Sequence, residues 1–281
     1  MSFQSSNPPY LLSFPEKTAV PLIVSSPHSG QDYPTDFLQA ARLSIHDLQK
    51  AEDRFVDKLF DAAPEIGATF LRAAFPRVWC DVNRDRRELD ARMFKPPLPS
   101  TALLRTPKVR AGFGVIPRCA SQGRAIYSHC LAPEEVERRI SSCWLPYHQA
   151  LSELISDVKT KFGYALLVDV HSMPRLEQYR ECNVVFGDAH GHSCSSKIIG
   201  FLEENFQSRG YSTQRNVPYA GGYITRNYGR PLQGVHAIQI ELCRSLYMNT
   251  ATLEPSRMFI KVREDLKQIM GDLAFAFSEK I

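Results

Sequence analysis

Two histidines and a glutamate stand where apolar runs of the chain end, and these residue types can bind a metal and move a proton. They are His28 after residues 22–27, His171 after residues 164–170, and Glu241 after residues 237–240. Runs rich in Val, Leu and Ile are typical of buried strands. Because open α/β sheets bind ligands beyond the carboxyl ends of their strands, we expect the three side chains to share one catalytic cleft that holds a metal.

A hydrolytic zinc site has three protein ligands and keeps a fourth position for water. We expect His28 and His171 to supply two of the ligands. The third is open between Asp53, its neighbour Glu52, and Asp57, which lies four residues on and would share a helix face with Asp53. A single histidine at a strand end is often only structural, but two of them with a glutamate favour a metal site.

Glu241 lies between two aliphatic residues, and a carboxylate in such a setting is rarely buried without a reason. As a general base it would take a proton from a metal-bound water. The structural alternative is a buried ion pair with Arg244. Asp169, two residues before His171, is a candidate acceptor for the second ring nitrogen of that histidine.

Asn83 and Arg84 also follow an apolar run. The planar fork of an arginine matches a carboxylate, and a neighbouring asparagine adds a donor. The pair therefore predicts recognition of an acidic substrate. The structural alternative is a surface ion pair of Arg84 with Asp85 or Glu88.

The hydrophobic pattern predicts strands that alternate with helices. Strands are expected at 20–26, 68–74, 78–82, 164–173 and 183–186 and in a run that ends at Glu241, and helices at 53–63, 133–162 (kinked or split by Pro146), 193–205 and 256–277. Residues 90–124 lack periodicity and are expected to form a long surface excursion. This alternation predicts an α/β fold with three layers, a mainly parallel or mixed central sheet with helices on both faces.

Composition excludes several other classes of protein. With 281 residues and 43% hydrophobic residues, the chain is expected to form a single domain over residues 1–281. A net charge of +4 without a basic run argues against nucleic acid as a partner, and no apolar run is long enough to span a membrane. Residues 1–10 do not resemble a signal peptide. Seven cysteines without a C-x-x-C pair predict reduced thiols in a cytoplasmic enzyme.

Nucleophilic and nucleotide chemistry also lack support. Ser29 and Ser172 follow the two histidines, but neither lies in a G-x-S-x-G elbow. Gly221-Gly222 is not followed by the Lys-Ser/Thr of a P-loop.

Six short segments, in this order and spacing, resemble the N-formylglutamate amidohydrolase family. They are Pro27-His28-Ser29-Gly30, Glu52-Asp53-Arg54-Phe55-Val56-Asp57, Asp81-Val82-Asn83-Arg84, Asp169-Val170-His171-Ser172-Met173, Asn216-Val217-Pro218-Tyr219-Ala220-Gly221-Gly222 and Gln239-Ile240-Glu241-Leu242. The resemblance implies a zinc-exopeptidase-like (phosphorylase/hydrolase-like) fold, similar to that of zinc carboxypeptidases and aspartoacylases. It also implies a zinc enzyme that hydrolyses the amide of a small N-formyl or N-acyl acidic amino acid, first of all N-formyl-L-glutamate.

The resemblance also implies residue roles, with one departure from the pattern. Asn83 and Arg84 would bind the substrate carboxylate, and Glu241 would be the base. Zinc carboxypeptidases and aspartoacylases take two ligands from H-x-x-E, whereas Gln31 stands at the fourth position here. We therefore favour Asp53 as the third zinc ligand.

Arg244 and Arg226 are further candidates for substrate binding. Another N-acyl amino acid or a peptide-like amide remains an alternative substrate. A non-catalytic binding protein on the same fold is the alternative from another class.

Overall fold

The computed structural model describes residues 8–15, 19–99 and 103–278. Its internal contacts divide the chain into two compact units. The first unit contains residues 1–11, 27–52 and 73–150, and the second contains residues 12–26, 53–72 and 151–281. Within the described ranges, no helix combines the length and the apolar composition that crossing a membrane requires.

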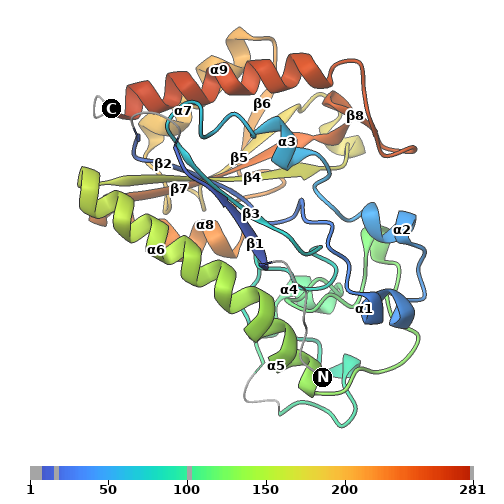
Figure 1. The fold of residues 1–281 in the computed structure, drawn as a ribbon. Coiled ribbons are helices and arrows are strands. Elements are labelled where there is room, and N and C mark those ends of the chain that lie inside the picture. Colours follow the sequence, from blue (N-terminus) through green and yellow to red (C-terminus); the bar gives the residue numbers. More distant parts are fainter. Residues whose placement is uncertain (1–7, 16–18, 100–102, 279–281) are drawn as a thin grey trace. The chain divides into compact units, whose positions relative to one another are not determined.

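The main sheet has seven strands and is mixed (Figure 1). In spatial order the strands are β1 (Tyr10–Ser13), β3 (Thr69–Ala73), β2 (Leu22–Ser26), β4 (Ala165–Met173), β7 (Val235–Cys243), β5 (Val184–Gly187) and β6 (Thr213–Arg215). Strand β2 pairs in parallel with β3 and β4, and β4 pairs in parallel with β7. Among the described strand pairs of this sheet, β5 and β7 run antiparallel. The predicted α/β class with a mixed sheet is confirmed.

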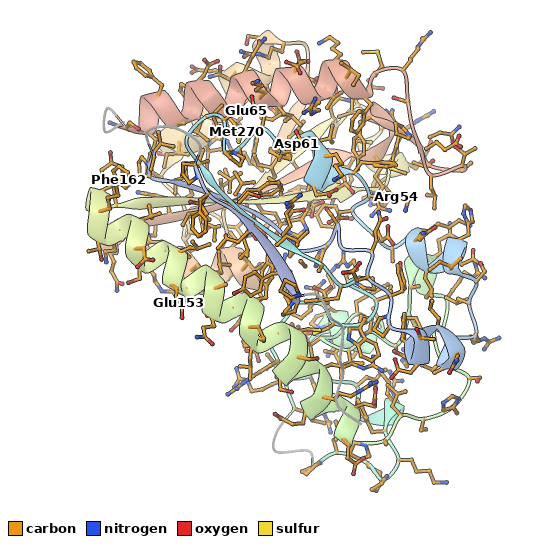
Figure 2. All side chains as sticks on the ribbon, viewed as in Figure 1. Arg54, Asp61, Glu65, Glu153, Phe162 and Met270 are labelled. Carbon is orange, nitrogen blue, oxygen red and sulfur yellow. The ribbon has the colours of Figure 1, made fainter. Side chains whose placement is uncertain are left out.

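Helices cover both faces of the sheet in the second unit. On one face lie α3 (Val56–Leu59), α7 (Ser196–Ser208) and α9 (Phe259–Ser278). On the other face lie α8 (Tyr223–Tyr228) and the part of α6 (Leu145–Phe162) after residue 150 (Figure 1). Two ion pairs link α9 to the segment after α3, Arg263–Asp61 and Lys267–Glu65, at 2.8 and 2.5 Å. Figure 2 labels Asp61 and Glu65 of this segment.

The period-2 pattern of the central strands separates apolar from polar side chains. Every residue of β4 is buried. Leu166, Val168 and Val170 of β4, like Ile238 and Ile240 of β7, belong to the core beneath α7 and α9. Because successive side chains of a strand point to opposite faces, the polar residues between them lie on the face covered by α8. On β4 these are Asp169 and His171, and on β7 they are Gln239 and Glu241.

The helix predicted over 53–63 is mostly absent. Only α3, with four residues, is helical, and the residues around it form turns. Phe55 has a left-handed φ of 66°, so regular helix cannot begin before Val56. The argument that Asp53 and Asp57 share a helix face was therefore wrong. The apolar side chains whose spacing predicted a helix, such as Val56, Leu59 and Phe60, are buried, but the residues around α3 reach this burial through turns.

The strand predicted over 78–82 was also wrong. These residues form turns, and the backbone N–H of Trp79 donates to the carbonyl of Pro76 at 2.9 Å. The apolar run is buried in the first unit instead. The guanidinium of Arg139 lies 3.7 Å from the ring centre of Trp79 and donates to its carbonyl oxygen.

The excursion over 90–124 is irregular, as expected, but it is not confined to the surface. It contains the short helical segments η1 (Ala91–Met93), α4 (Pro107–Arg110) and η3 (Ser121–Gly123), and its residues 100–102 lie outside the described part. Val115, Ile116 and Ala120 are almost fully buried. Non-periodic sequence therefore supplies part of the core of the first unit.

The long helix predicted over 133–162 is present as one continuous run of helical backbone, which contains a π-helical turn before Pro146 and is not split at the proline. It comprises α5 (Glu134–Arg139), a π-helical turn (Ile140–Trp144) and α6. Pro146 has no N–H to bond to the residue four before it, and a widened turn just before the proline accommodates this. The helices expected over 193–205 and 256–277 are present as α7 and α9.

Several short elements were not predicted. They are α1 (Thr35–Ala40), α2 (Ile45–Gln49), α8, β1, β6, β8 (Met248–Asn249) and β9 (Glu254–Pro255), together with η5 to η7 at Glu177–Tyr179, Pro231–Gln233 and Arg244–Leu246. All seven cysteines are free, and Cys130 is the exposed one.

Candidate active site

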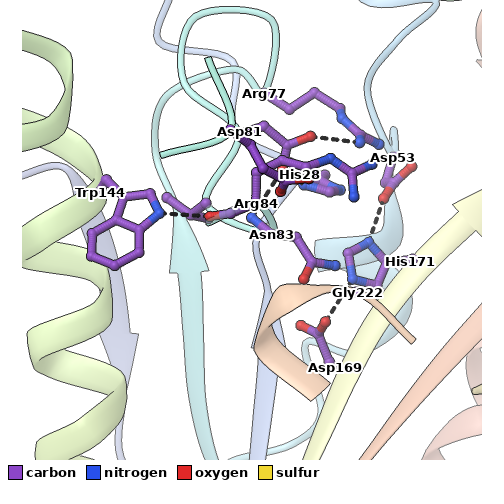
Figure 3. A network of polar contacts seen from close by, with 12 residues as sticks. His28, Asp53, Arg77, Asp81, Asn83, Arg84, Trp144, Asp169, His171 and Gly222 are labelled. Carbon is purple, nitrogen blue, oxygen red and sulfur yellow. Dashed lines mark hydrogen bonds and ion pairs between the residues drawn. The ribbon is translucent and has the colours of Figure 1, made fainter. Parts of the chain in front are cut away.

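His171 is the centre of a buried polar cluster in the second unit. Its Nδ1 lies 3.0 Å from Oδ2 of Asp53 and its Nε2 lies 2.8 Å from Oδ2 of Asp169 (Figure 3). The hydroxyl of Ser25 on β2 donates to the other oxygen of Asp169 at 2.9 Å. Asp169 and His171 share a face of β4, so the contact that was considered from the sequence is made within one strand.

Electrostatics in this cluster favour a positive charge at the ring of His171. Burial alone would lower the pKa of this imidazole. The charge of Asp169 and the hydrogen bonds to Asp169 and Asp53 outweigh burial and raise the pKa well above its usual value. A ring enclosed by carboxylates suits either a proton or a metal cation.

Asp53 is held by a serine and an arginine as well as by the imidazole. Its Oδ1 accepts from the hydroxyl of Ser172 and from Nη2 of Arg244, each at 3.1 Å. Nε of Arg244 also donates to Oγ of Ser172 at 3.0 Å. Arg244 therefore forms an ion pair with the buried carboxylate of Asp53.

Glu241 lies beside His171 across two paired strands. The register pairs His171 of β4 with Glu241 of β7 and Asp169 with Gln239. Glu241 is the third residue from the end of β7, not the last one as the sequence suggested. It is 7% exposed, and its Oε1 accepts from Nε2 of Gln239 at 2.8 Å. The predicted base is thus buried and oriented.

His28 belongs to a second cluster, in the first unit, two residues after the end of β2. Its Nε2 lies 2.7 Å from Oδ1 of Asp81, and Nη2 of Arg77 donates to Oδ2 of Asp81 at 2.8 Å (Figure 3). Burial would raise the pKa of Asp81, but His28 and Arg77 outweigh it and hold that pKa well below the usual value. No role was predicted for Asp81, although it ends the same apolar run as the Asn-Arg pair.

Arg84 also adds charge to this cluster, since its guanidinium helps to lower the pKa of Asp81. Its Nε is buried without a hydrogen-bond partner among the described atoms, and its carbonyl accepts from the indole of Trp144 at 2.9 Å (Figure 3). Both residues considered as surface partners are engaged elsewhere: Asp85 pairs with Arg87 at 2.8 Å, and Glu88 accepts from the hydroxyl of Thr106 at 2.6 Å. Asn83 is buried, and its backbone N–H donates to Asp81.

The remaining candidates have other contacts. Glu52 accepts from the hydroxyl of Tyr33 at 2.5 Å. Asp57 lies on α3 beside Lys58, and partial burial raises its pKa. Arg226 is exposed, and its Nε donates to the carbonyl of Gly221. Three buried side chains among the described residues, His28, Asp53 and His171, each offer one atom that could bind a metal ion.

Comparison with known proteins identifies the chain as a hydrolase. The family model of N-formylglutamate amidohydrolase matches residues 20–248. The N-formylglutamate deformylase of Pseudomonas aeruginosa is 35% identical over 246 residues, which cover 85% of this chain and 86% of that protein. The deformylase of the same name from Pseudomonas putida is 32% identical over 270 residues, covering 92% of this chain and 90% of that protein.

Solved structures agree with the sequence comparisons. The crystal structure of N-formylglutamate amidohydrolase from Ralstonia eutropha matches with a TM-score of 0.91 and 34% identity, covering 97% of this chain and 99% of that one. A gene product of Agrobacterium tumefaciens shares the fold alone, with a TM-score of 0.70 and 17% identity over 98% of each chain. The chain belongs to the N-formylglutamate amidohydrolase family, and the resemblance drawn from its motifs is confirmed.

Proposed function

We propose that the protein is a zinc-dependent hydrolase that cleaves N-formyl-L-glutamate to formate and L-glutamate. The names of two relatives that match most of the chain support this substrate. The observation that carries the proposal is the buried cluster of His171, Asp53 and Asp169, with Glu241 in register with the histidine. We propose further that residues 1–281 act as a single domain. A cytoplasmic location stays a prediction.

The proposed zinc ligands are His28, Asp53 and His171. Two imidazoles and a carboxylate are ordinary zinc ligands, and three of them leave a position for water. Zinc-binding histidines usually donate their other ring nitrogen to a carboxylate. Both rings have such a partner at Nε2, Asp81 for His28 and Asp169 for His171, and this supports the assignment. The donors therefore fit zinc.

The remaining chemistry belongs to the side chains of this chain. When bound, zinc polarises a carbonyl and lowers the pKa of water from about 15.7 towards about 7. Glu241 accepts a proton from the attacking water and delivers it to the amine nitrogen of glutamate as the C–N bond breaks. Arg84 and Asn83 bind a carboxylate of the substrate. Arg244 is proposed as a further substrate contact, through the same guanidinium that binds Asp53.

Metal analysis combined with a substrate panel tests this proposal. We expect about one zinc per chain, lost in His171→Ala, and hydrolysis of N-formyl-L-glutamate in preference to the N-acetyl and N-succinyl analogues. Glu241→Gln removes the proton acceptor but no ligand, so it is expected to abolish turnover while zinc remains bound. Normal turnover by Glu241→Gln would show that the assigned base is wrong. Preference for a larger acyl group would indicate the alternative amidase, and a protein without turnover of any member of the panel would indicate the binding protein.

A further inference from the structure

The side chain of Gln239 joins two parts of the second unit that are far apart in the sequence. Its Nε2 donates to Oε1 of Glu241 at 2.8 Å, and its Oε1 accepts from the backbone N–H of Gly222 at 2.8 Å. Gln239 is 4% exposed and lies on the same face of β7 as Glu241. An amide buried at this depth is held by its hydrogen bonds, because leaving them unmade is costly.

The two hydrogen bonds fix the orientation of the amide. A backbone N–H can only donate, so the end of Gln239 that faces Gly222 must be its carbonyl oxygen. The NH2 group must then point at Glu241, which accepts. Of the two oxygens of Glu241, Oε1 is thereby assigned to the amide. The position of Gly222 thus fixes the amide of Gln239, and the amide in turn orients the carboxylate of Glu241.

The turn that contains Gly222 is itself seated closely on strand β5. Gly187, the last residue of β5, is in register with Gln239, and a Cβ on it would lie 2.5 Å from the backbone nitrogen of Gly221. The N–H of Ala189 donates to the carbonyl of Ala220 at 2.7 Å. The glycine therefore permits a backbone approach that brings Gly222 within reach of the amide.

We propose that Gln239 is a positioning residue that aims the carboxylate of Glu241 by tying it to the turn at 219–222. This inference rests on the proposed function, in which Glu241 moves the proton. Gln239 acts on the reaction only through Glu241, to which it donates. Gln239 restricts the rotamer of the Glu241 side chain. The position of the turn at 219–222 determines how tightly the rotamer is restricted. Besides Gln239, the register neighbours of Glu241 are His171 on β4 and Val185 on β5, and of these only His171 can carry charge.

Two substitutions separate the two hydrogen bonds of Gln239. Gln239→Leu removes both, and we expect kcat to fall about 10- to 100-fold while KM changes less than about threefold, because one hydrogen bond to a charged group is lost. Gln239→Glu keeps an acceptor for Gly222 but sets a second carboxylate against Glu241. The amide donor to Glu241 is then lost while the contact to Gly222 can be kept, so kcat should fall as far as in Gln239→Leu, again with KM changed less than about threefold.

Gln214→Leu is the matched control, since Gln214 lies on β6 and its Oε1 has no partner among the described atoms. It should retain wild-type kcat. Wild-type kcat in Gln239→Leu or in the nearly isosteric Gln239→Glu overturns the inference. If Glu241→Gln itself turns over normally, it is the proposed function that fails, so the two failures are distinguishable. Thermal unfolding of each variant separates loss of fold from loss of positioning.

Discussion

The side chain of Arg84 has one buried hydrogen-bond donor that the described atoms do not use. Its carbonyl is anchored by Trp144, while Nε stays buried and without a partner among the described atoms. A buried donor without a partner is costly, and a substrate carboxylate would remove that cost. The same reasoning explains why an arginine is needed, since a lysine offers a point charge and no planar fork.

Arg84→Lys is expected to raise KM for N-formyl-L-glutamate about 10- to 100-fold with a smaller change in kcat, because one charge-assisted hydrogen bond of the pair is lost. Steady-state kinetics measures both constants. Arg87→Lys is the control, because Arg87 is exposed and paired with Asp85. An unchanged KM in Arg84→Lys would remove Arg84 from the substrate site.

In the proposed zinc site, Asp169 would act through His171, whose Nε2 lies 2.8 Å from Oδ2 of Asp169. Asp169→Asn keeps the shape of the side chain but weakens the hydrogen bond to Nε2 of His171. Loss of such a hydrogen-bond partner typically lowers metal affinity about 10- to 100-fold. Competition with a chromophoric zinc chelator measures the affinity. Asp188→Asn, at a buried aspartate bonded to Asn216, should leave it unchanged. Equal zinc affinity in wild type and Asp169→Asn would contradict the proposed ligand arrangement.

The residues proposed to carry the chemistry were easier to select from the sequence than the residues that hold them in place. His28, Asp53, His171 and Glu241 could be selected from the sequence because each polar side chain interrupts an apolar run or opens a motif. Asp81 and Gln239 could not be given roles in the same way. Their hydrogen bonds depend on which strands become neighbours and on how closely a turn approaches, and neither is encoded in local spacing.

The same contrast holds between elements. Strands β2, β4 and β7 were predictable because they are buried on both faces and read as continuous apolar runs. The helix predicted around α3 failed because a series of turns can bury residues three and four apart just as a helix does. Only tertiary contacts decide between them, here including Phe55 against Phe259 with ring centres 5.9 Å apart.

At the level of elements, Gly187→Ala tests how closely the turn must sit on β5. The new Cβ would meet backbone atoms of Ala220 and Gly221 at under 3 Å, so the turn must move away. We expect kcat to fall about tenfold or more, by the same route as in Gln239→Leu. Gly200→Ala on α7 is the control, since a Cβ there would meet nothing within 4 Å. Wild-type kcat in Gly187→Ala would show that the turn can shift without disturbing catalysis.

For the whole molecule, the sequence predicted the sheet-based second unit far better than the first unit. Strands and helices produce a periodic hydrophobic pattern in the sequence of the second unit. The first unit instead buries irregular segments such as 78–82 and part of 90–124. Its core is built around polar anchors. Arg139 is 1% exposed and bonds to Glu135, Tyr127 and the carbonyl of Trp79. Such multiple contacts from one side chain are not visible as periodicity.

Arg139→Ala should therefore lower the free energy of unfolding of the first unit by about 2–4 kcal/mol. The reason is that the substitution removes the buried guanidinium and leaves the carboxylate of Glu135 without this partner. Both tryptophans of the chain lie in this unit, so urea denaturation followed by tryptophan fluorescence reports on it directly. Arg87→Ala, which breaks an exposed pair, should cost less than about 1 kcal/mol. Equal losses in the two variants would show that Arg139 is not an anchor.

Six of the seven thiols are enclosed by protein, and only Cys130 meets solvent. Burial raises the pKa of the Cys143 thiol to about 11 and also raises those of Cys80 and Cys194. Thiolates are the reactive species, so the interior sulfurs stay inert while the fold persists. Air oxidation during storage should consequently join two copies through a single position, and a maleimide dye should attach once per folded chain without touching the polar clusters.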